Sequence, residues 1–212
     1  MKLYSYWRST TSMRVRAALN LKGVAYETVP VNLVAGEQKE DAFAQVNPGM
    51  GVPALELEDG RIITQSVALL DYIEETWPTP ALLPSDAVER AQVRAAAAQI
   101  ALDIHPVNNL KVLGYLKGTL GHTQEDTVVW MNHWMTEGFR AFERLLSAGT
   151  PYCFGEAIGL ADLCLVGQMI NARRWGCDLS PFGRLVDIDA LCRENEAIER
   201  AMPDAQPDAQ PA

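Results

Sequence analysis

The sequence predicts an α/β domain over residues 1–80 and an all-helical domain over residues 85–201. Strand-like and helix-like segments alternate in the first 76 residues, whereas the hydrophobic pattern of the rest is almost entirely helical. Pro78, Pro80 and Pro84 lie between the two regions and stiffen the connection. A chain of 212 residues is long enough for two modest domains.

The first elements of the α/β domain are a strand, a helix, a second strand and a second helix. Residues 2–7 are apolar and aromatic, as in a strand, and helical spacing over residues 10–22 ends at Gly23. Residues 25–31 are rich in β-branched and aromatic side chains, so we expect a strand parallel to the first through a right-handed crossover. A short helix is predicted over residues 40–46.

The α/β domain closes with a hairpin and a helix. Residues 53–57 and 61–64 are strand-like and flank the turn residues Glu58-Asp59-Gly60. Helical periodicity then returns over residues 66–77. The order βαβαββα predicts a thioredoxin-like domain, in which parallel and antiparallel strands share one sheet covered by helices on both faces.

The second domain is predicted as helices joined by short breaks. Asp86 is the expected N-cap of the first helix, and residues 103–106 are expected to bend or break it. The helical patterns cover residues 86–102, 107–116, 124–148, 159–175 and 185–200. Residues 203–212 contain Pro-Asp-Ala-Gln twice and no large apolar side chain, so we expect a disordered tail over residues 202–212.

The composition excludes several classes of protein. The chain carries 18 Lys and Arg against 27 Asp and Glu, and its net charge of −9 opposes binding to nucleic acid. No segment resembles a membrane span or a signal peptide, so we expect a soluble cytoplasmic protein. The spacing of the cysteines fits no metal site and no C-x-x-C motif, and they are expected to be free thiols. They are Cys153, Cys164, Cys177 and Cys192.

The corner between the first strand and the first helix is the first candidate site. Hydroxyl groups of Ser9, Thr10 and Thr11 lie there at a helix N-terminus, which favours an anion. The corner has no cysteine and cannot exchange disulfides by itself, but its hydroxyls can stabilise a thiolate that a ligand brings. Ordinary N-capping is the alternative explanation.

Two further segments are predicted to face a ligand. Pro53 opens a strand, and proline allows the peptide bond between Val52 and Pro53 to be cis. This arrangement leaves the Val52 N–H and C=O available to an extended, peptide-like ligand. Gln65 and Ser66 begin a helix and offer a second anion pocket. Together with the corner they predict a site for a small anionic thiol peptide, although turn and cap chemistry explains each segment alone.

Residues 4–23, YSYWRSTTSMRVRAALNLKG, resemble the N-terminal signature of zeta-class glutathione transferases. This class includes maleylacetoacetate isomerase and maleylpyruvate isomerase. The resemblance covers nearly the whole chain except the tail. Its further blocks are residues 47–48, 52–53, 65–66, 78–84, 103–110, 161–166 and 178–181.

The resemblance implies glutathione as the cofactor and a homodimer as the assembly. It implies that Arg8, Ser9, Thr10 and Thr11 form the catalytic corner. Arg8 and Arg174 are the implied ligands of the substrate carboxylates, with Arg173 as the alternative to Arg174. The implied glutathione contacts are Ser9, Thr11, Gln38, Val52, Pro53, Gln65, Ser66, His105, Asn109, Leu110 and Lys111.

The activity that the resemblance implies is cis–trans isomerisation of maleylacetoacetate to fumarylacetoacetate by reversible addition of the glutathione thiolate. Maleylpyruvate is the nearest alternative substrate, and the apolar Leu110 favours the longer one. Glutathione transfer to α-halo acids, or their dehalogenation, uses the same thiolate. A non-catalytic scaffold is disfavoured because the candidate site chemistry is retained, at Arg8, Ser9, Val52-Pro53 and Gln65-Ser66. Two positions depart from the family: Thr11 stands where many relatives have cysteine, and Gly159 where a helix usually starts with Ser or Thr.

Overall fold

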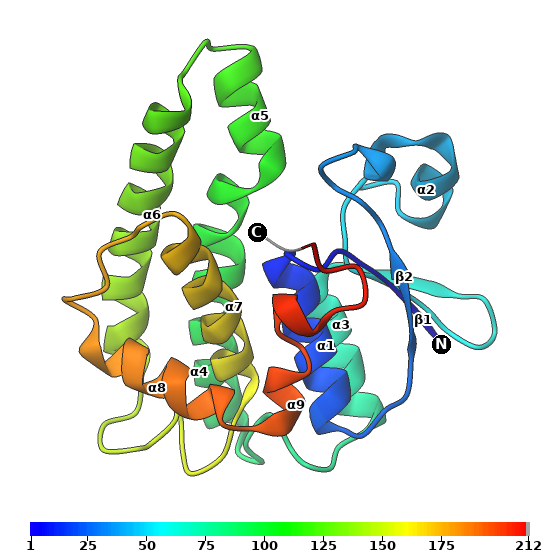
Figure 1. Ribbon diagram of the computed structural model, residues 1–212. Coiled ribbons are helices and arrows are strands. Elements are labelled where there is room, and N and C mark those ends of the chain that lie inside the picture. The colour runs from blue at the N-terminus through cyan, green and yellow to red at the C-terminus, as the bar shows by residue number, and fades with distance from the viewer. Residues whose placement is uncertain (211–212) are drawn as a thin grey trace. The chain divides into compact units, whose positions relative to one another are not determined.

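The computed structural model describes residues 1–210 and divides the chain into two compact units (Figure 1). One unit contains Met1–Leu82 together with the residues from Arg193 onward, and the other contains Leu83–Cys192. The division after Leu82 lies in the proline-rich segment. None of the helices in residues 1–210 is long and apolar enough to cross a membrane.

The first unit contains a four-stranded mixed sheet in the order β2-β1-β3-β4. Strand β1 pairs in parallel with β2 and antiparallel with β3, and β3 and β4 form an antiparallel hairpin. The strands are β1 (Lys2–Ser5), β2 (Glu27–Pro30), β3 (Ala54–Glu56) and β4 (Ile62–Thr64). The predicted thioredoxin-like arrangement is therefore confirmed.

Helices cover both faces of this sheet. The Tyr4 ring in β1 contacts the Phe43 ring of α2, with centroids 6.1 Å apart, whereas the neighbouring Ser5 faces α1 and accepts a hydrogen bond from Arg16. Helix α1 packs against α3 and, near the C-terminus, against α9. The helices are α1 (Thr10–Leu21), η1 (Glu37–Lys39), α2 (Asp41–Val46), α3 (Ser66–Thr76), α9 (Glu196–Glu199) and η4 (Pro203–Ala205).

The second unit is all helical. The predicted break is a π-helical turn, η2, which continues α4 and ends where Pro106 starts a short 3-10 helix. Gly138 of α6 lies directly against this turn: a Cβ there would fall 2.2 Å from Ile104 Cγ1, so only glycine fits. The helices are α4 (Ala87–Ala98), η2 (Gln99–Ile104), η3 (Pro106–Asn108), α5 (Leu110–Gly118), α6 (Gln124–Leu145), α7 (Leu160–Arg174) and α8 (Gly183–Arg193).

Helix α7 is buried along most of its length and begins at the unusual cap Gly159. Asp162, in the first turn, supplies the other half of a capping box, because its carboxylate accepts hydrogen bonds from Gly159 N over 2.8 Å and from Cys153 N over 2.9 Å. Burial raises the pKa of the Cys153 thiol well above its usual value. All four cysteines are free and buried, as expected.

The predicted last helix is wrong in its extent. The helix is interrupted between α8 and α9, where the Asn195 side chain caps α9 by accepting a hydrogen bond from Ala197 N. An Asn within a helical hydrophobic pattern is compatible with one continuous helix or with the start of a new one, because its side chain competes with the helix for backbone groups. Residues 185–200 thus form two helices in place of one.

The prediction of a disordered tail is corrected over residues 202–210. Pro203 starts a 3-10 turn, and the buried Gln206 side chain donates to the carbonyls of Arg200 and Met202 over 2.8 Å each. Asp208 accepts a hydrogen bond from Trp7 N over 3.0 Å. This segment docks through polar groups, which a search for apolar side chains does not detect. The remaining residues of that prediction, 211–212, lie outside the described residues.

Candidate active site

The turn between β1 and α1 presents hydroxyl groups at a helix N-terminus. Ser9 is the N-cap of α1, and its Oγ accepts a hydrogen bond from Ser12 N over 3.2 Å. Ser9 and Thr11 are half-buried, whereas Thr10 is buried. Ordinary helix capping accounts for the bond to Ser12, so this bond alone does not indicate a ligand.

Two further hydrogen bonds involve the hydroxyls of this corner. The Ser9 and Thr11 hydroxyl oxygens lie 2.9 Å apart, and Thr11 Oγ1 donates to the Val52 carbonyl over 3.0 Å. Because Thr11 has one hydroxyl proton and directs it to Val52, the proton between the two hydroxyls comes from Ser9. The Ser9 O–H is therefore the donor that a charged acceptor at this corner would attract away from Thr11.

The loop before β3 holds Val52 next to this corner. Asn47 braces the loop, since its side chain accepts from Gly49 N over 2.9 Å and donates to Gly51 O over 2.6 Å. The peptide bond between Val52 and Pro53 is cis. The Val52 N–H has no hydrogen-bond partner within residues 1–210, but the Val52 carbonyl, predicted to be available, accepts from Thr11.

Gln65 has an unfavourable backbone conformation at the start of α3. Its φ of +72° lies in the region that favours glycine, yet Gln65 is an exposed glutamine. Backbone strain of this kind occurs mainly at binding and catalytic sites, where the surrounding structure holds the residue in its unfavourable conformation. The buried Ser66 follows as the first residue of α3. No feature of the sequence predicts the positive φ.

Gln38 leaves a buried oxygen without a donor. Its side chain lies in η1, 8% exposed, and Nε2 donates to Leu33 O over 3.4 Å. Within residues 1–210, Gln38 Oε1 is buried and has no hydrogen-bond partner. Leaving such an oxygen unpaired is costly, so this position suits an N–H group of a ligand.

Four further candidate residues lie in the second unit, around the start of α5. His105 is half-buried and follows the π-helical turn, whereas Leu110 and Lys111 are exposed. Asn109 is the N-cap of α5, and its Oδ1 accepts from Lys111 N over 3.1 Å. Capping explains the Asn109 contact without a ligand.

The two adjacent arginines at the end of α7 have different surroundings. Arg173 Nη1 lies 2.6 Å from Oδ2 of Asp189, whose side chain is fully buried. Arg174 is exposed at the last position of the helix. In the first unit, the Arg8 guanidinium lies 5.0 Å from the centre of the Trp7 ring, a cation–π contact that restrains it.

Comparisons with known proteins identify the family. Residues 1–75 match the model of the glutathione S-transferase N-terminal domain. The maleylpyruvate isomerase of a Ralstonia species is 46% identical over 99% of this chain and 100% of that protein. The holo structure of a maleylpyruvate isomerase, a bacterial zeta-class glutathione S-transferase, has a TM-score of 0.96 and 46% identity, covering 99% of this chain and 100% of the other. The chain belongs to the zeta class of glutathione transferases.

A maleylacetoacetate isomerase of the same class has a similar structure. The enzyme from Methylobacterium extorquens AM1, solved with bound malonate and GSH, has a TM-score of 0.95 and 37% identity, with 100% of both chains covered. The zeta-class membership confirms the family predicted from residues 4–23. Thr11 stands where many relatives of this class have cysteine. In this chain its hydroxyl donates a hydrogen bond to Val52 O.

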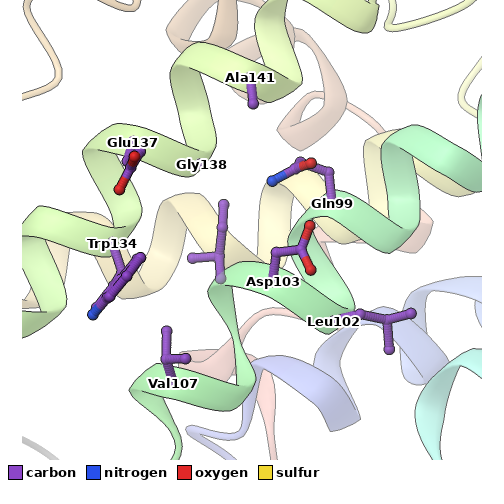
Figure 2. Close-up of a pocket in the computed structure, with 9 residues that line it drawn as sticks. Gln99, Leu102, Asp103, Val107, Trp134, Glu137, Gly138 and Ala141 are labelled. Atoms are coloured by element: carbon purple, nitrogen blue, oxygen red, sulfur yellow. The ribbon is translucent and has the colours of Figure 1, made fainter.

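The pocket in Figure 2 is not the predicted site of this zeta-class transferase. It lies in the second unit between η2 and α6, and it contains none of the candidate residues. Asp103 and Glu137 bring two carboxylates to its lining. A negatively charged lining disfavours glutathione and a dicarboxylate, which are both anions.

Sequence reasoning missed Arg16 and Asp208 in the first unit. Arg16 is fully buried in α1, and its guanidinium donates to backbone carbonyls of Tyr6 and Trp7, beside the corner. A charged residue on the buried side of a helix is a detectable signal, since arginine is rarely buried without partners. No feature of the sequence marks Asp208 as a hydrogen-bond acceptor, because its partner Trp7 is distant in the sequence.

Proposed function

We propose that this zeta-class transferase is a glutathione-dependent cis–trans isomerase that converts maleylacetoacetate to fumarylacetoacetate. The observation that carries the proposal is the Ser9 O–H, which lies at the N-terminus of α1 and donates to Thr11. A hydroxyl donor at the positive end of a helix stabilises a thiolate over a thiol. The relative solved with GSH and malonate supports a site for a thiol peptide and a dicarboxylate.

The first unit offers groups that fit glutathione. The Val52 N–H suits its cysteinyl backbone beside Pro53, and the unpaired Gln38 Oε1 suits an N–H of the peptide. Gln65 and Ser66 are assigned to the γ-glutamyl end, where the start of α3 favours a carboxylate. From the second unit we assign contacts to His105, Asn109, Leu110 and Lys111.

When bound, glutathione supplies a thiolate that adds reversibly to the cis double bond and so permits rotation about it. The chain's own residues have two tasks. Ser9, supported by Thr10 and Thr11 in the corner, donates to the sulfur and keeps it ionised near neutral pH. Arg8 and Arg174 hold the two carboxylates of the substrate, which suit the planar fork of arginine.

An isomerase assay with and without glutathione tests the proposal. We expect trans product from maleylacetoacetate only when glutathione is present, with no net consumption of the thiol. An α-halo acid in the same assay separates isomerisation from glutathione transfer and dehalogenation, because attack of the thiolate on the halogen-bearing carbon releases halide. Equal turnover without glutathione contradicts the glutathione-dependent mechanism. No turnover of the maleyl substrates or of the α-halo acid leaves the scaffold alternative.

Maleylpyruvate is the second candidate substrate. The 46% identity with the Ralstonia maleylpyruvate isomerase favours it, whereas the exposed apolar Leu110 favours the longer maleylacetoacetate. The ratio of kcat/KM for the two substrates decides between them, because this ratio measures discrimination directly.

We also propose a cytoplasmic homodimer. Four free cysteines and the use of reduced glutathione are typical of a reducing compartment. The dimer is supported by the family resemblance, and sedimentation tests it. A mass of 23.3 kDa at micromolar concentration, that of a single chain, contradicts it.

A further inference from the structure

Arg16 uses every hydrogen-bond donor of its guanidinium group. Nη1 donates to Ser5 Oγ over 2.9 Å and to Tyr6 O over 3.3 Å, and Nη2 donates to Trp7 O over 3.2 Å. Nε and Nη2 both donate to Ala201 O, over 3.1 and 2.8 Å. An arginine has five N–H donors, so none is left over. Lysine, with three donors on one atom, cannot reproduce this set.

Ala201 begins a segment that we call the C-terminal strap, residues 201–208. Gln206 holds the strap in shape through its two bonds to the carbonyls of Arg200 and Met202. At its end, Asp208 Oδ2 accepts a hydrogen bond from Trp7 N over 3.0 Å. The Trp7 backbone is therefore held from two sides, its carbonyl by Arg16 and its N–H by the strap.

The charges in this cluster argue for a role beyond stability. The acceptors of Arg16 are backbone carbonyls and one hydroxyl, so the buried cation has no carboxylate in its hydrogen-bond set. Burial lowers the pKa of Arg16 to about 10, against the opposing influence of Tyr26 and Asp208. Apolar side chains of similar volume usually stabilise a core as well as buried charges do.

The backbone that this cluster holds carries the catalytic corner. Ser9 N donates to Tyr6 O over 2.9 Å, which closes the turn around the residues that Arg16 contacts. Arg8 lies between Trp7 and Ser9 in the chain and stacks on the Trp7 ring. A displacement of the Trp7 backbone therefore moves the thiolate donor and the carboxylate ligand together.

We propose that Arg16 and Asp208 of the C-terminal strap are positioning residues of the active site, which fix the Tyr6–Trp7 backbone so that Ser9 and Arg8 meet the reactants. The proposal rests on the proposed isomerase function for the role of Arg8. The role of Ser9 toward glutathione is testable without any maleyl substrate.

The repeated Pro-Asp-Ala-Gln sequence supplies a matched pair of variants. Asp208→Ala removes the acceptor of Trp7 N, whereas Asp204→Ala makes the same change at an exposed aspartate one repeat earlier. We expect Asp208→Ala to raise the pKa of the bound glutathione thiol, measured by ultraviolet titration, and to lower kcat/KM by about threefold to tenfold. Asp204→Ala is expected to match the parent protein in both.

Several outcomes overturn the proposal. If Asp208→Ala lowers thermal stability but leaves the thiol pKa and kcat/KM unchanged, the strap is only structural. If Asp204→Ala and Asp208→Ala act equally, the effect is one of tail charge. If Asp208→Ala does not fold, Asp208→Asn keeps an acceptor oxygen and is expected to retain the parent thiol pKa; a large shift in this variant contradicts the hydrogen-bond role.

Arg16→Lys provides a second, independent test. It keeps the positive charge and loses most of the five bonds, so we expect a larger rise in the thiol pKa than for Asp208→Ala. An unchanged thiol pKa in folded Arg16→Lys refutes the positioning role. Because the titration uses glutathione alone, it stands even if the parent protein fails to isomerise either maleyl substrate.

Discussion

Replacing Ser9 by alanine is expected to raise the pKa of the glutathione thiol bound to this protein and to lower kcat/KM at neutral pH by about tenfold or more. The reason is that Ser9 carries the one hydroxyl proton of the pair that is not directed to the Val52 carbonyl. Ultraviolet titration of the bound thiolate measures the pKa, and initial rates across the pH range measure the consequence.

The sign of the pH effect follows from the ionisation of the thiol. Only the thiolate reacts, so activity rises with pH as the thiol loses its proton. Stabilisation of the thiolate lowers the thiol pKa and makes activity available at lower pH. Loss of the Ser9 donor shifts the profile to higher pH, and the difference between variant and parent should shrink once the pH exceeds both pKa values.

Two control variants separate this effect from helix capping. Ser9→Gly also removes the hydroxyl, but glycine costs only a few tenths of a kcal/mol at an N-cap, so its thiol pKa should rise with little loss of stability. Ser12→Ala removes a buried hydroxyl that has no hydrogen-bond partner within residues 1–210 and should behave as the parent. An unchanged pKa in Ser9→Ala would transfer the role to Thr10 or Thr11.

The sequence was sufficient to predict the elements whose residues contact near neighbours. The hairpin around Gly60 and the parallel pairing of β1 with β2 follow from turn chemistry and from the crossover rule. The break after α4 follows from Pro106. Each depends on local backbone preferences that a single segment displays by itself.

Long-range polar contacts account for what the sequence did not predict. The strap is ordered because Gln206 and Asp208 bond to backbone groups, and no apolar periodicity marks such docking. Likewise, the sequence does not distinguish the two adjacent arginines at the end of α7, whereas the structure places Arg173 2.6 Å from the buried Asp189 carboxylate. In the site, the Val52 carbonyl was predicted to be free because its partner, Thr11, is distant in sequence.

The contrast between the two adjacent arginines leads to the second prediction of large effect. Arg174→Met is expected to lower kcat/KM for the preferred maleyl substrate by roughly tenfold to 150-fold, the loss of about 1.5–3 kcal/mol that one charge-assisted hydrogen bond supplies. Glutathione affinity should barely change, since Arg174 is assigned to the dicarboxylate. Steady-state kinetics and calorimetric titration with glutathione measure the two quantities.

Arg173→Met is the matched control in the neighbouring residue. It removes the cation next to the fully buried Asp189 carboxylate and should lower the free energy of unfolding by about 1–3 kcal/mol. Its kcat/KM at a temperature where it is folded should stay near that of the parent. Arg173→Met is thus expected to lower stability, and Arg174→Met to lower turnover, although the two positions are adjacent in one helix.

Arg8→Met completes the test of the two-cation model. It should weaken turnover as strongly as Arg174→Met, because each arginine is assigned to a separate carboxylate. Arg174→Lys keeps the charge without the planar fork, and a partial recovery of kcat/KM indicates bidentate binding of the carboxylate. If Arg173→Met loses turnover while Arg174→Met keeps it, the assignments are exchanged. If Arg8→Met and Arg174→Met both retain full activity, the carboxylates are held elsewhere and the two-cation model is refuted.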